Sequence, residues 1–390
     1  MLCTGNFIGA FNTLLMVPLL PLVVLDLGVS ISDGGLLLTA PMLVGALAGL
    51  WAGPAMDRRG RRPLVVAGLL LVGVCNLAMA IAPSFWVAVA LRAGTGLGMT
   101  ALFPATLSAA GEYFSYRERG KAMGLAITAG SSAPLLGVPI ASVIAGLTSW
   151  RLALLLVGAL AIGLGVLLYA KLPHDRPTGE AARAALGVRA SLRTVMQHPA
   201  AAMSIVAMFF QAGYWFVMVT YIGALFFQRY EAPAWALGGL NSLLALGIMV
   251  GANGGGRLGD RLGKRRTAIV STACCAVFGT LITTAAPVVW LALLYVILYA
   301  IPNGARVATA QAVLSELVPG LRGTLSTLGA AGQSLGASMG SFLGSVVMGT
   351  VGFDGLGPTV GVLALISTLV FWRWVHEAPE QTEPAAVPAG

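Results

Sequence analysis

Charged residues are scarce in this chain of 390 residues. They make up 9% of it, whereas hydrophobic residues make up 57%, and the mean hydropathy is +0.88. A soluble domain carries roughly 25% charged residues, so this chain has too few of them to cover a water-exposed surface. The composition therefore excludes a soluble globular enzyme, a disordered protein and a nucleic-acid-binding protein. It indicates a protein that crosses a membrane many times.

Residues that carry hydrolytic, redox or metal chemistry are also few, with three His and four Cys. All four cysteines lie in apolar runs, as small buried hydrophobic residues do, and not in the polar loops of a short disulfide-linked domain. The interiors of the predicted membrane spans hold no Asp, Glu or His, and no HExxH, GxSxG or P-loop pattern occurs. We therefore expect no enzymatic activity, no bound metal and no cofactor.

Apolar runs long enough to cross a membrane occur twelve times, in two groups of six. A helix that crosses about 30 Å of hydrocarbon needs roughly 20 apolar residues. The opening segment has no base before Arg58, so we expect a first spanning helix there and not a cleaved signal peptide. The predicted spans are 3–25, 34–56, 63–82, 85–110, 122–146, 151–172, 201–227, 234–256, 267–286, 288–313, 324–350 and 358–374.

The basic residues gather on one side of these spans. With the first helix leaving the cytoplasm, 19 of the 23 Lys and Arg fall on the cytoplasmic side, and the other side receives only Arg151 and Arg229. The positive-inside rule then places both termini in the cytoplasm. We expect the protein to be a multi-pass protein of the cell's inner membrane. We expect six-helix bundles at 1–172 and 201–376, a cytoplasmic linker at 173–200 and a disordered tail at 377–390.

The two halves carry the same loop motif, G-x-x-x-D-R-x-G-[RK]-R, at a constant offset of 203 residues. Glu112 falls near Glu316 at almost the same offset in a later loop. Two six-helix halves with the same sense predict parallel repeats about an axis normal to the membrane. The motif residues are Gly53, Asp57, Arg58, Gly60, Arg61 and Arg62 in the first copy, and Gly256, Asp260, Arg261, Gly263, Lys264 and Arg265 in the second.

Each copy of the motif must turn the chain tightly between two helices. Gly60 permits a turn with positive φ. Asp57 would be unfavourable at the negative end of a helix unless Arg61 or the other half compensates its charge. Such an ion pair can form in one conformation and break in another, so we interpret the motif as a conformational latch. The alternative is a basic topology anchor combined with a turn.

These features resemble the major facilitator superfamily of secondary transporters, over nearly the whole chain. The duplicated loop is similar to the superfamily's motif A, which the family places against the eleventh helix, and Arg92-x-x-Thr95-Gly96-x-Gly98 is similar to its motif B. The resemblance implies an all-α fold of twelve transmembrane helices in two pseudo-symmetric bundles. Motifs similar to those of twelve-helix drug:proton antiporters are Pro18-x-x-Pro21 and Gly130-x-x-Ala133-Pro134-x-x-Gly137.

Two arginines lie well inside predicted spans, where a charge is costly unless it faces protein or water. Arg92 and Arg306 are therefore candidates for handling a solute or a coupled ion. The alternatives are a hydrogen-bonded structural role for Arg92 and snorkelling for Arg306. Asp26, at the outer end of the first helix, is a further coupling candidate, and a solvated rim position is its alternative.

Neutral polar and aromatic residues share faces of several predicted helices. A pocket for a small organic molecule combines an apolar lining with a few polar groups, and these faces fit that description. Their alternative is contact with lipid or a place in the interfacial aromatic belt. The candidate substrate-binding residues are Asn6, Gln211, Tyr214, Trp215, Tyr221, Asn241, Tyr295, Tyr299, Asn303 and Gln333.

Three functions compete on this basis. The first is a monomeric secondary transporter that exports a small organic solute, a drug or a metabolite, by alternating access. The resemblance implies that such export can be coupled to protons. The second is a carrier of a small organic or inorganic anion that uses Arg92 or Arg306. The third, a membrane-embedded enzyme or channel, is disfavoured by the lack of acids and histidines in the spans.

Overall fold

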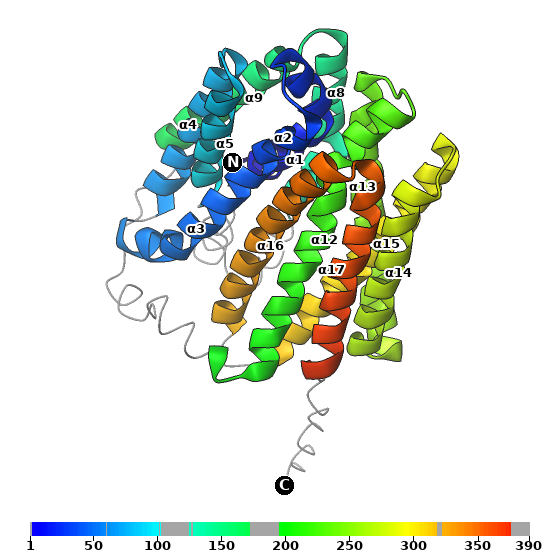
Figure 1. The fold of residues 1–390 in the computed structure, drawn as a ribbon. Helices are drawn as coiled ribbons and strands as arrows, with labels where there is room; N and C mark the ends of the chain where they lie inside the picture. Colours follow the sequence, from blue (N-terminus) through cyan, green and yellow to red (C-terminus); the bar gives the residue numbers. More distant parts are fainter. Residues whose placement is uncertain are drawn as a thin grey trace.

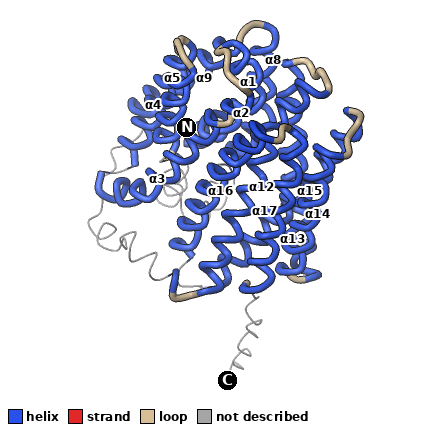
Figure 2. The backbone as a smooth tube through the Cα atoms, in the orientation of Figure 1, coloured by secondary structure: helices blue, strands red, loops and turns tan. Residues whose placement is uncertain are grey.

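The described part of the chain is almost entirely helical in the computed structural model, as Figure 2 shows. It comprises residues 2–59, 61–100, 102, 125, 128–171, 195–317 and 322–375. The first half contains α1 (Leu2–Asp26), α2 (Ile31–Gly34), α3 (Leu36–Arg59), α4 (Arg61–Ala80), α5 (Phe85–Met99), the π-helical turn η1 (Ala133–Gly137), α8 (Val138–Leu147) and α9 (Trp150–Lys171). The second contains α12 (Pro199–Arg229), the short η2 (Ala234–Ala236), α13 (Leu237–Leu262), α14 (Lys264–Thr284), α15 (Val289–Leu317), α16 (Arg322–Thr350) and α17 (Phe353–Trp374).

Ten of the described helical segments are long and apolar enough to cross a membrane. The fourth position in sequence order is taken by the shorter apolar α5, and the eleventh by α16, which is rich in Gly and Ser. Together they make the twelve predicted spans. The predicted linker and tail fall largely on residues 172–194 and 376–390, and Glu112 falls within 103–124, which are outside the described residues.

The helices pack as two groups that meet near one end of the molecule (Figure 1). Within the first half, α4 packs on α5 and α9, and α3 packs on α5; within the second, α12 packs on α16 and α17, and α15 on α13 and α14. Between the halves, α16 contacts α2 and α3, α13 contacts α8, and α12 contacts α1. Large apolar side chains such as Trp86 and Trp290 are exposed on the outside, as expected of a surface that faces lipid.

The internal repeat is visible in matched contacts at one end of each half. A guanidinium nitrogen (Nη2) of Arg62 donates to the backbone oxygen of Tyr169, and Nη2 of Arg265 donates to that of Trp372. Both the donors and the acceptors are 203 residues apart. The predicted repeat therefore extends to side-chain contacts between the third and sixth helix of each half.

A second matched pair of contacts lies at the opposite end, with the charges exchanged. Arg151 forms an ion pair with Asp26 in the first half, and Arg229 pairs with Asp354 at 3.2 Å in the second. Asp26 aligns with Arg229, and Arg151 with Asp354, at the offset of 203. Asp26 is thus paired and partly solvated, which favours the rim position over the coupling role that the sequence left open for it.

Because the second half uses the opposite polarity, the first ion pair should tolerate reversal. We expect Asp26→Arg alone to destabilise the detergent-solubilised protein by at most about 1 kcal/mol, since the partners are 39% and 41% exposed. Adding Arg151→Asp should restore the melting temperature. A double variant no more stable than the single one would contradict this.

The turn between α13 and α14 is shorter than predicted. The sequence suggested a loop over Gly256–Arg265, but α13 continues to Leu262 and α14 begins at Lys264. Gly263 alone breaks the helix, with a φ of 91°. Glycine adopts positive φ without steric cost and commonly ends helices, so one residue suffices for the turn.

Candidate functional site

Hydrogen bonds join the start of the second span to α16 and α12 of the other half. The Tyr221 hydroxyl donates to the Ser32 backbone oxygen at 3.1 Å. The Ser341 hydroxyl donates to Gly35 O at 3.2 Å, and Ser345 Oγ also donates to Ser32 O. Backbone oxygens of the first half are therefore satisfied by hydroxyl groups of the second half.

A second seam joins α8 to η2 and α13. The Ser142 hydroxyl donates to Ala234 O at 2.8 Å and accepts from the Gly238 N–H at 2.9 Å. The Ser242 hydroxyl donates to Leu135 O at 2.9 Å. A Cβ atom at Gly238 would lie 2.5 Å from Cα of Pro139, so this close approach requires glycine.

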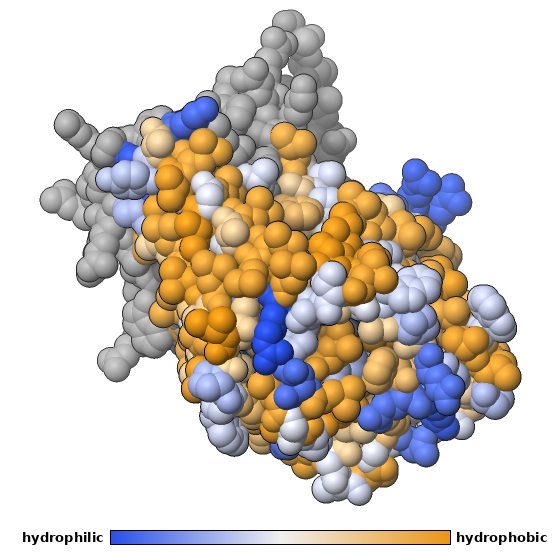
Figure 3. All heavy atoms as spheres, turned by 90° about the horizontal axis from the view of Figure 1, so that it is seen from above, coloured by the Kyte–Doolittle hydropathy of each residue, from blue (hydrophilic) through white to orange (hydrophobic). Residues whose placement is uncertain are grey.

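Both seams lie at the same end of the helices, where α1 ends, α3 begins and α13 begins. We call this end the sealed side. Within the described residues, every hydrogen bond between the halves falls in these seams or beside them. Figure 3 views the molecule from this side and shows apolar atoms over much of the described face, with several strongly hydrophilic patches among them. The two halves are thus closed against each other on the sealed side.

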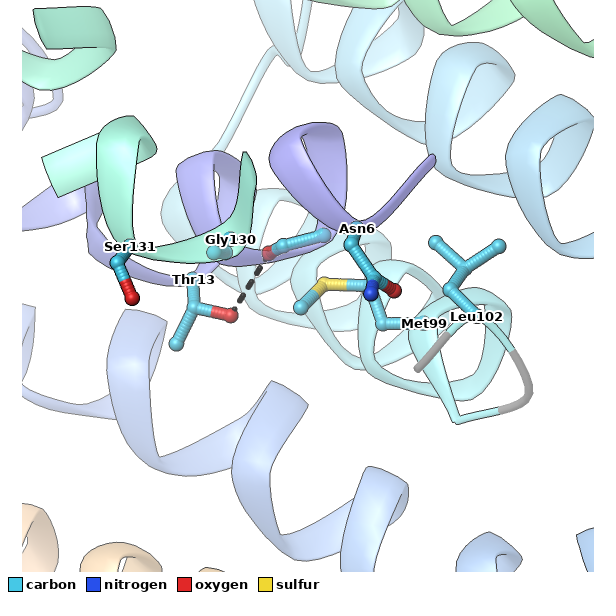
Figure 4. A pocket seen from close by; sticks show the side chains of 8 residues that line it. Asn6, Thr13, Met99, Leu102, Gly130 and Ser131 are labelled. Carbon is cyan, nitrogen blue, oxygen red and sulfur yellow. Dashed lines mark hydrogen bonds between the residues drawn. The ribbon is translucent and has the colours of Figure 1, made fainter. Parts of the chain in front are cut away.

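A cavity of about 380 Å³ lies toward the other end of α1 (Figure 4). Its walls are α1, the end of α5 and the residues before η1. Asn6, a predicted substrate-binding residue, and Gly130 of the antiporter-like motif line it together with Ser131 and Met99. Amide and hydroxyl groups in an otherwise apolar wall suit a small, largely apolar solute.

The antiporter-like motif sits beside this cavity and distorts the helix that carries it. Pro134 lies in the π-helical turn η1, where its missing N–H interrupts the regular hydrogen bonding. Gly130 has no atom within 4 Å of an added Cβ position, whereas Gly137 lies against the rings of Phe7 and Phe11. The motif therefore combines open space at one glycine with close packing of α1 at the other.

Arg92 of α5 is completely buried, and protein oxygens satisfy its charge. Its Nε donates to Leu37 O at 3.1 Å, and its Nη atoms donate to Asn12 O at 3.2 and 3.3 Å and to Asn12 Oδ1 at 3.4 Å. Pro41 has no N–H for the Leu37 carbonyl four residues earlier, so this oxygen is free to accept from Arg92. The arrangement favours the structural role among the two that the sequence left open.

Sequence reasoning missed two partners in this buried cluster. Asn12 is completely buried beside Arg92, and Asn76 donates from Nδ2 to Asn12 Oδ1 at 2.9 Å. The available signal was the presence of two amide side chains inside otherwise apolar spans, a rare and costly placement. The cluster joins α1, α3, α4 and α5 through polar contacts.

In the second half, a polar seam lies between α12 and α15. Gln211 Nε2 donates to Asn303 Oδ1 at 3.0 Å, and the Tyr214 hydroxyl donates to the same oxygen at 3.2 Å. The Tyr299 hydroxyl donates to Tyr214 O at 3.2 Å, and the Trp215 and Tyr299 rings stack at 5.3 Å. The structure therefore brings five of the predicted substrate-binding residues together.

Arg306 lies one turn beyond Asn303 on α15 and differs from Arg92 in its contacts. Its side chain is completely buried, with the guanidinium over the Phe371 ring at 4.5 Å. Its Nη1 and Nη2 atoms have no hydrogen-bond partner in the described part of the chain. The arrangement disfavours snorkelling, the alternative that the sequence left open for Arg306, because the guanidinium is fully buried.

Other predicted substrate-binding residues are placed apart from this seam. Tyr221 belongs to the sealed side, through its bond to Ser32. Asn241 is buried in α13, Tyr295 packs its ring near Phe278 at 6.3 Å, and Gln333 is half-buried in α16. These four residues lie on four different helices, α12, α13, α15 and α16.

The second copy of the predicted latch is open to solvent. Asp260, in the last turn of α13, is exposed and forms no ion pair with another described residue. Arg261 is also exposed, whereas Arg265 contacts Trp372. In the first copy, Gly60 lies outside the described residues, as do the side chains from Gly53 to Arg61.

Nearly the whole chain is similar to known membrane transporters. The family model of the Major Facilitator Superfamily matches residues 2–300 and 242–389. The chain is 26% identical over 382 residues to an uncharacterized MFS-type transporter, YceJ, of Bacillus subtilis, covering 94% of this chain and 93% of that protein. It is 25% identical over 376 residues to the multi-drug resistance efflux pump PmrA of Streptococcus pneumoniae, covering 94% and 92%.

Solved structures share the fold at low sequence identity. A bacterial homolog of the human lysosomal transporter Spinster, in an inward-facing and occupied conformation, matches with a TM-score of 0.77 and 15% identity. It covers 95% of this chain and 94% of that one. A D-xylose-proton symporter matches with a TM-score of 0.77 and 17% identity, covering 96% and 97%.

Proposed function

Because the chain belongs to the Major Facilitator Superfamily, we propose that this secondary transporter exports a small organic solute by alternating access. The observation that carries the proposal is the asymmetry between the two ends. Seams between the halves close one end, and the 380 Å³ cavity lies toward the other. A binding space that faces one side at a time is the geometry that alternating access requires.

The sealed side is the outer side in this proposal. The positive-inside rule places the basic loops and both termini in the cytoplasm, and the described basic residues Arg62, Arg261 and Arg265 lie at the end away from the seams. The structure then corresponds to a state ready to receive a solute from the cytoplasm. The similarity to a multi-drug resistance efflux pump supports export over uptake.

The motif that begins at Gly53 and its repeat act as the cytoplasmic latch in this scheme. In this scheme the cytoplasmic ends are apart while the outer side is sealed. Asp260 fits an open latch, since it is exposed and forms no ion pair with another described residue. Closure of the cytoplasmic side would bring Asp57 near the start of α16. The latch would thus stabilise the opposite state.

Transport by proteoliposomes containing the purified protein tests the proposal. Fluorescent aromatic solutes of neutral, cationic and anionic charge would be offered, with an imposed pH gradient in one arm and only a gradient of unlabelled solute in the other. We expect saturable counterflow of at least one solute, and acceleration by the pH gradient if protons are coupled. Solute flux equal to that of protein-free liposomes, or non-saturating flux in both directions, would contradict a carrier.

A further inference from the structure

The two buried arginines differ in one respect that bears on the substrate. Arg92 and Arg306 are both 0% exposed. Arg92 donates to three protein oxygens, whereas both Nη atoms of Arg306 lack a partner in the described residues. A guanidinium in a membrane interior is costly unless its charge and its donors are matched. The fold therefore supplies acceptors for the guanidinium of Arg92, whereas the Nη atoms of Arg306 require acceptors from a bound molecule.

The surroundings of Arg306 define what could satisfy it. One face of the guanidinium lies over the Phe371 ring at 4.5 Å, which leaves the edge that carries the Nη atoms. Neither ion pair of the described chain involves Arg306, so no carboxylate of the described residues lies within ion-pair distance of it. The free edge is a planar fork of donors that fits a carboxylate in a bidentate arrangement.

The polar seam between α12 and α15 lies next to Arg306, since Asn303 and Tyr299 precede it by three and seven residues on α15. The two helices pack mainly on other helices, α12 on α16 and α17, and α15 on α13 and α14. Side-chain hydrogen bonds through Asn303 and the stacked rings of Trp215 and Tyr299 bridge the seam. Side-chain contacts can part and re-form without unfolding either helix, and the rings then present flat apolar surfaces to an entering molecule.

We propose that Arg306 binds the carboxylate of the transported solute, which makes the substrate class an organic anion with a flat, apolar body. This inference rests on the proposed export function and names its substrate class. The carboxylate supplies a negative charge and two oxygen acceptors for the Nη atoms of Arg306, which the described residues do not provide. The rings of Trp215 and Tyr299 receive the apolar body.

Binding to the purified protein in detergent, at fixed ionic strength, tests the proposal without transport. The probes are benzoate and 1-naphthoate, each compared with its neutral amide, by calorimetry and by the shift in melting temperature. We expect wild-type protein to bind at least one carboxylate more than tenfold tighter than its amide. Arg306→Gln should lose this preference.

Two further variants control for folding and for charge. Arg306→Lys keeps the charge without the planar fork and should show a weakened preference, so it serves if Arg306→Gln does not fold. Arg373 is a matched control, since it is an exposed arginine that also lies over an aromatic ring, Trp374, at 5.7 Å. Arg373→Gln should keep the full preference.

Three results would overturn the proposal. They are an unchanged carboxylate preference in Arg306→Gln, no preference for any carboxylate over its amide in wild-type protein, and equal stabilisation by sodium chloride, which would assign a halide to Arg306. Failure of the export function gives a different pattern. Binding would then follow Arg306 as described, but proteoliposomes would show no flux. Export of neutral or cationic solutes without carboxylate binding would uphold the function and refute this inference.

Discussion

Replacing Arg92 with Met is expected to lower the free energy of unfolding by about 2–5 kcal/mol. The guanidinium donates to Leu37 O and to both oxygens of Asn12. Met would remove all of these bonds and leave Asn12 Oδ1 with the Asn76 amide as its remaining donor. Arg92→Lys should recover only part of the loss, because one ammonium group cannot reach all the acceptors that the planar fork joins. Size-exclusion chromatography after heating of the detergent-solubilised protein measures the effect.

Arg306→Met is the matched comparison and should behave in the opposite way. It removes a buried charge that has no hydrogen-bond partner at its Nη atoms, so in the absence of ligand its melting temperature should equal or exceed that of the wild type. Similar destabilisation by Arg92→Met and Arg306→Met would show that the contacts of the two arginines do not differ in energy.

Replacing Gly238 with Leu is expected to reduce transport by more than tenfold while leaving the folded yield nearly unchanged. An added Cβ would lie 2.5 Å from Cα of Pro139 and 2.6 Å from Cβ of Ser142, both in the other half. The larger Leu side chain would therefore hold α13 and α8 apart on the sealed side. Packing within each half is untouched, so the protein should fold but fail to seal.

Gly239 provides the control, because it is the next residue of the same helix and an added Cβ there has no atom within 4 Å. Gly239→Leu changes the backbone propensity in the same way and should transport normally. Equal transport by the two variants would mean that closure of this seam is not part of the cycle. A loss of folded protein in Gly238→Leu alone would mean that the contact is needed for folding.

The architecture could be predicted from the sequence because it depends on composition. The length of an apolar run fixes a membrane span, and the loop motif repeated at an offset of 203 fixes the relation between the halves. The same offset also aligns Asp26 with Arg229 and Arg151 with Asp354. The two ion pairs with exchanged charges could therefore have been predicted from the sequence. The prediction would have required matching each acid with a base more than 100 residues away.

The candidate site was predictable only in part, because side-chain partners depend on how helices turn toward one another. Arg92 stood out in the sequence as a charged residue inside an apolar span. One of its acceptors is the backbone oxygen of Leu37, which Pro41 leaves without a helical donor, and a backbone acceptor on another helix cannot be predicted from a residue pattern. Tyr221 shares a helical face with Gln211, yet the approach of α2 assigns its hydroxyl to Ser32. The polar helix faces were identified from the sequence. Which of their residues line the cavity, which form the seam between α12 and α15, and which lie in the cluster around Arg92 could be read only from the structure.

Access of a membrane-impermeant maleimide to a single cysteine in the cavity tests alternating access most directly. Ser131 lines the cavity and is exposed, so Ser131→Cys would be labelled in a chain whose four native cysteines are replaced. We expect labelling in inside-out vesicles and protection in right-side-out vesicles, with the preference shifted toward right-side-out vesicles when Gly238→Leu is added. Labelling from both sides at once, or an unchanged pattern in the presence of Gly238→Leu, would contradict the account.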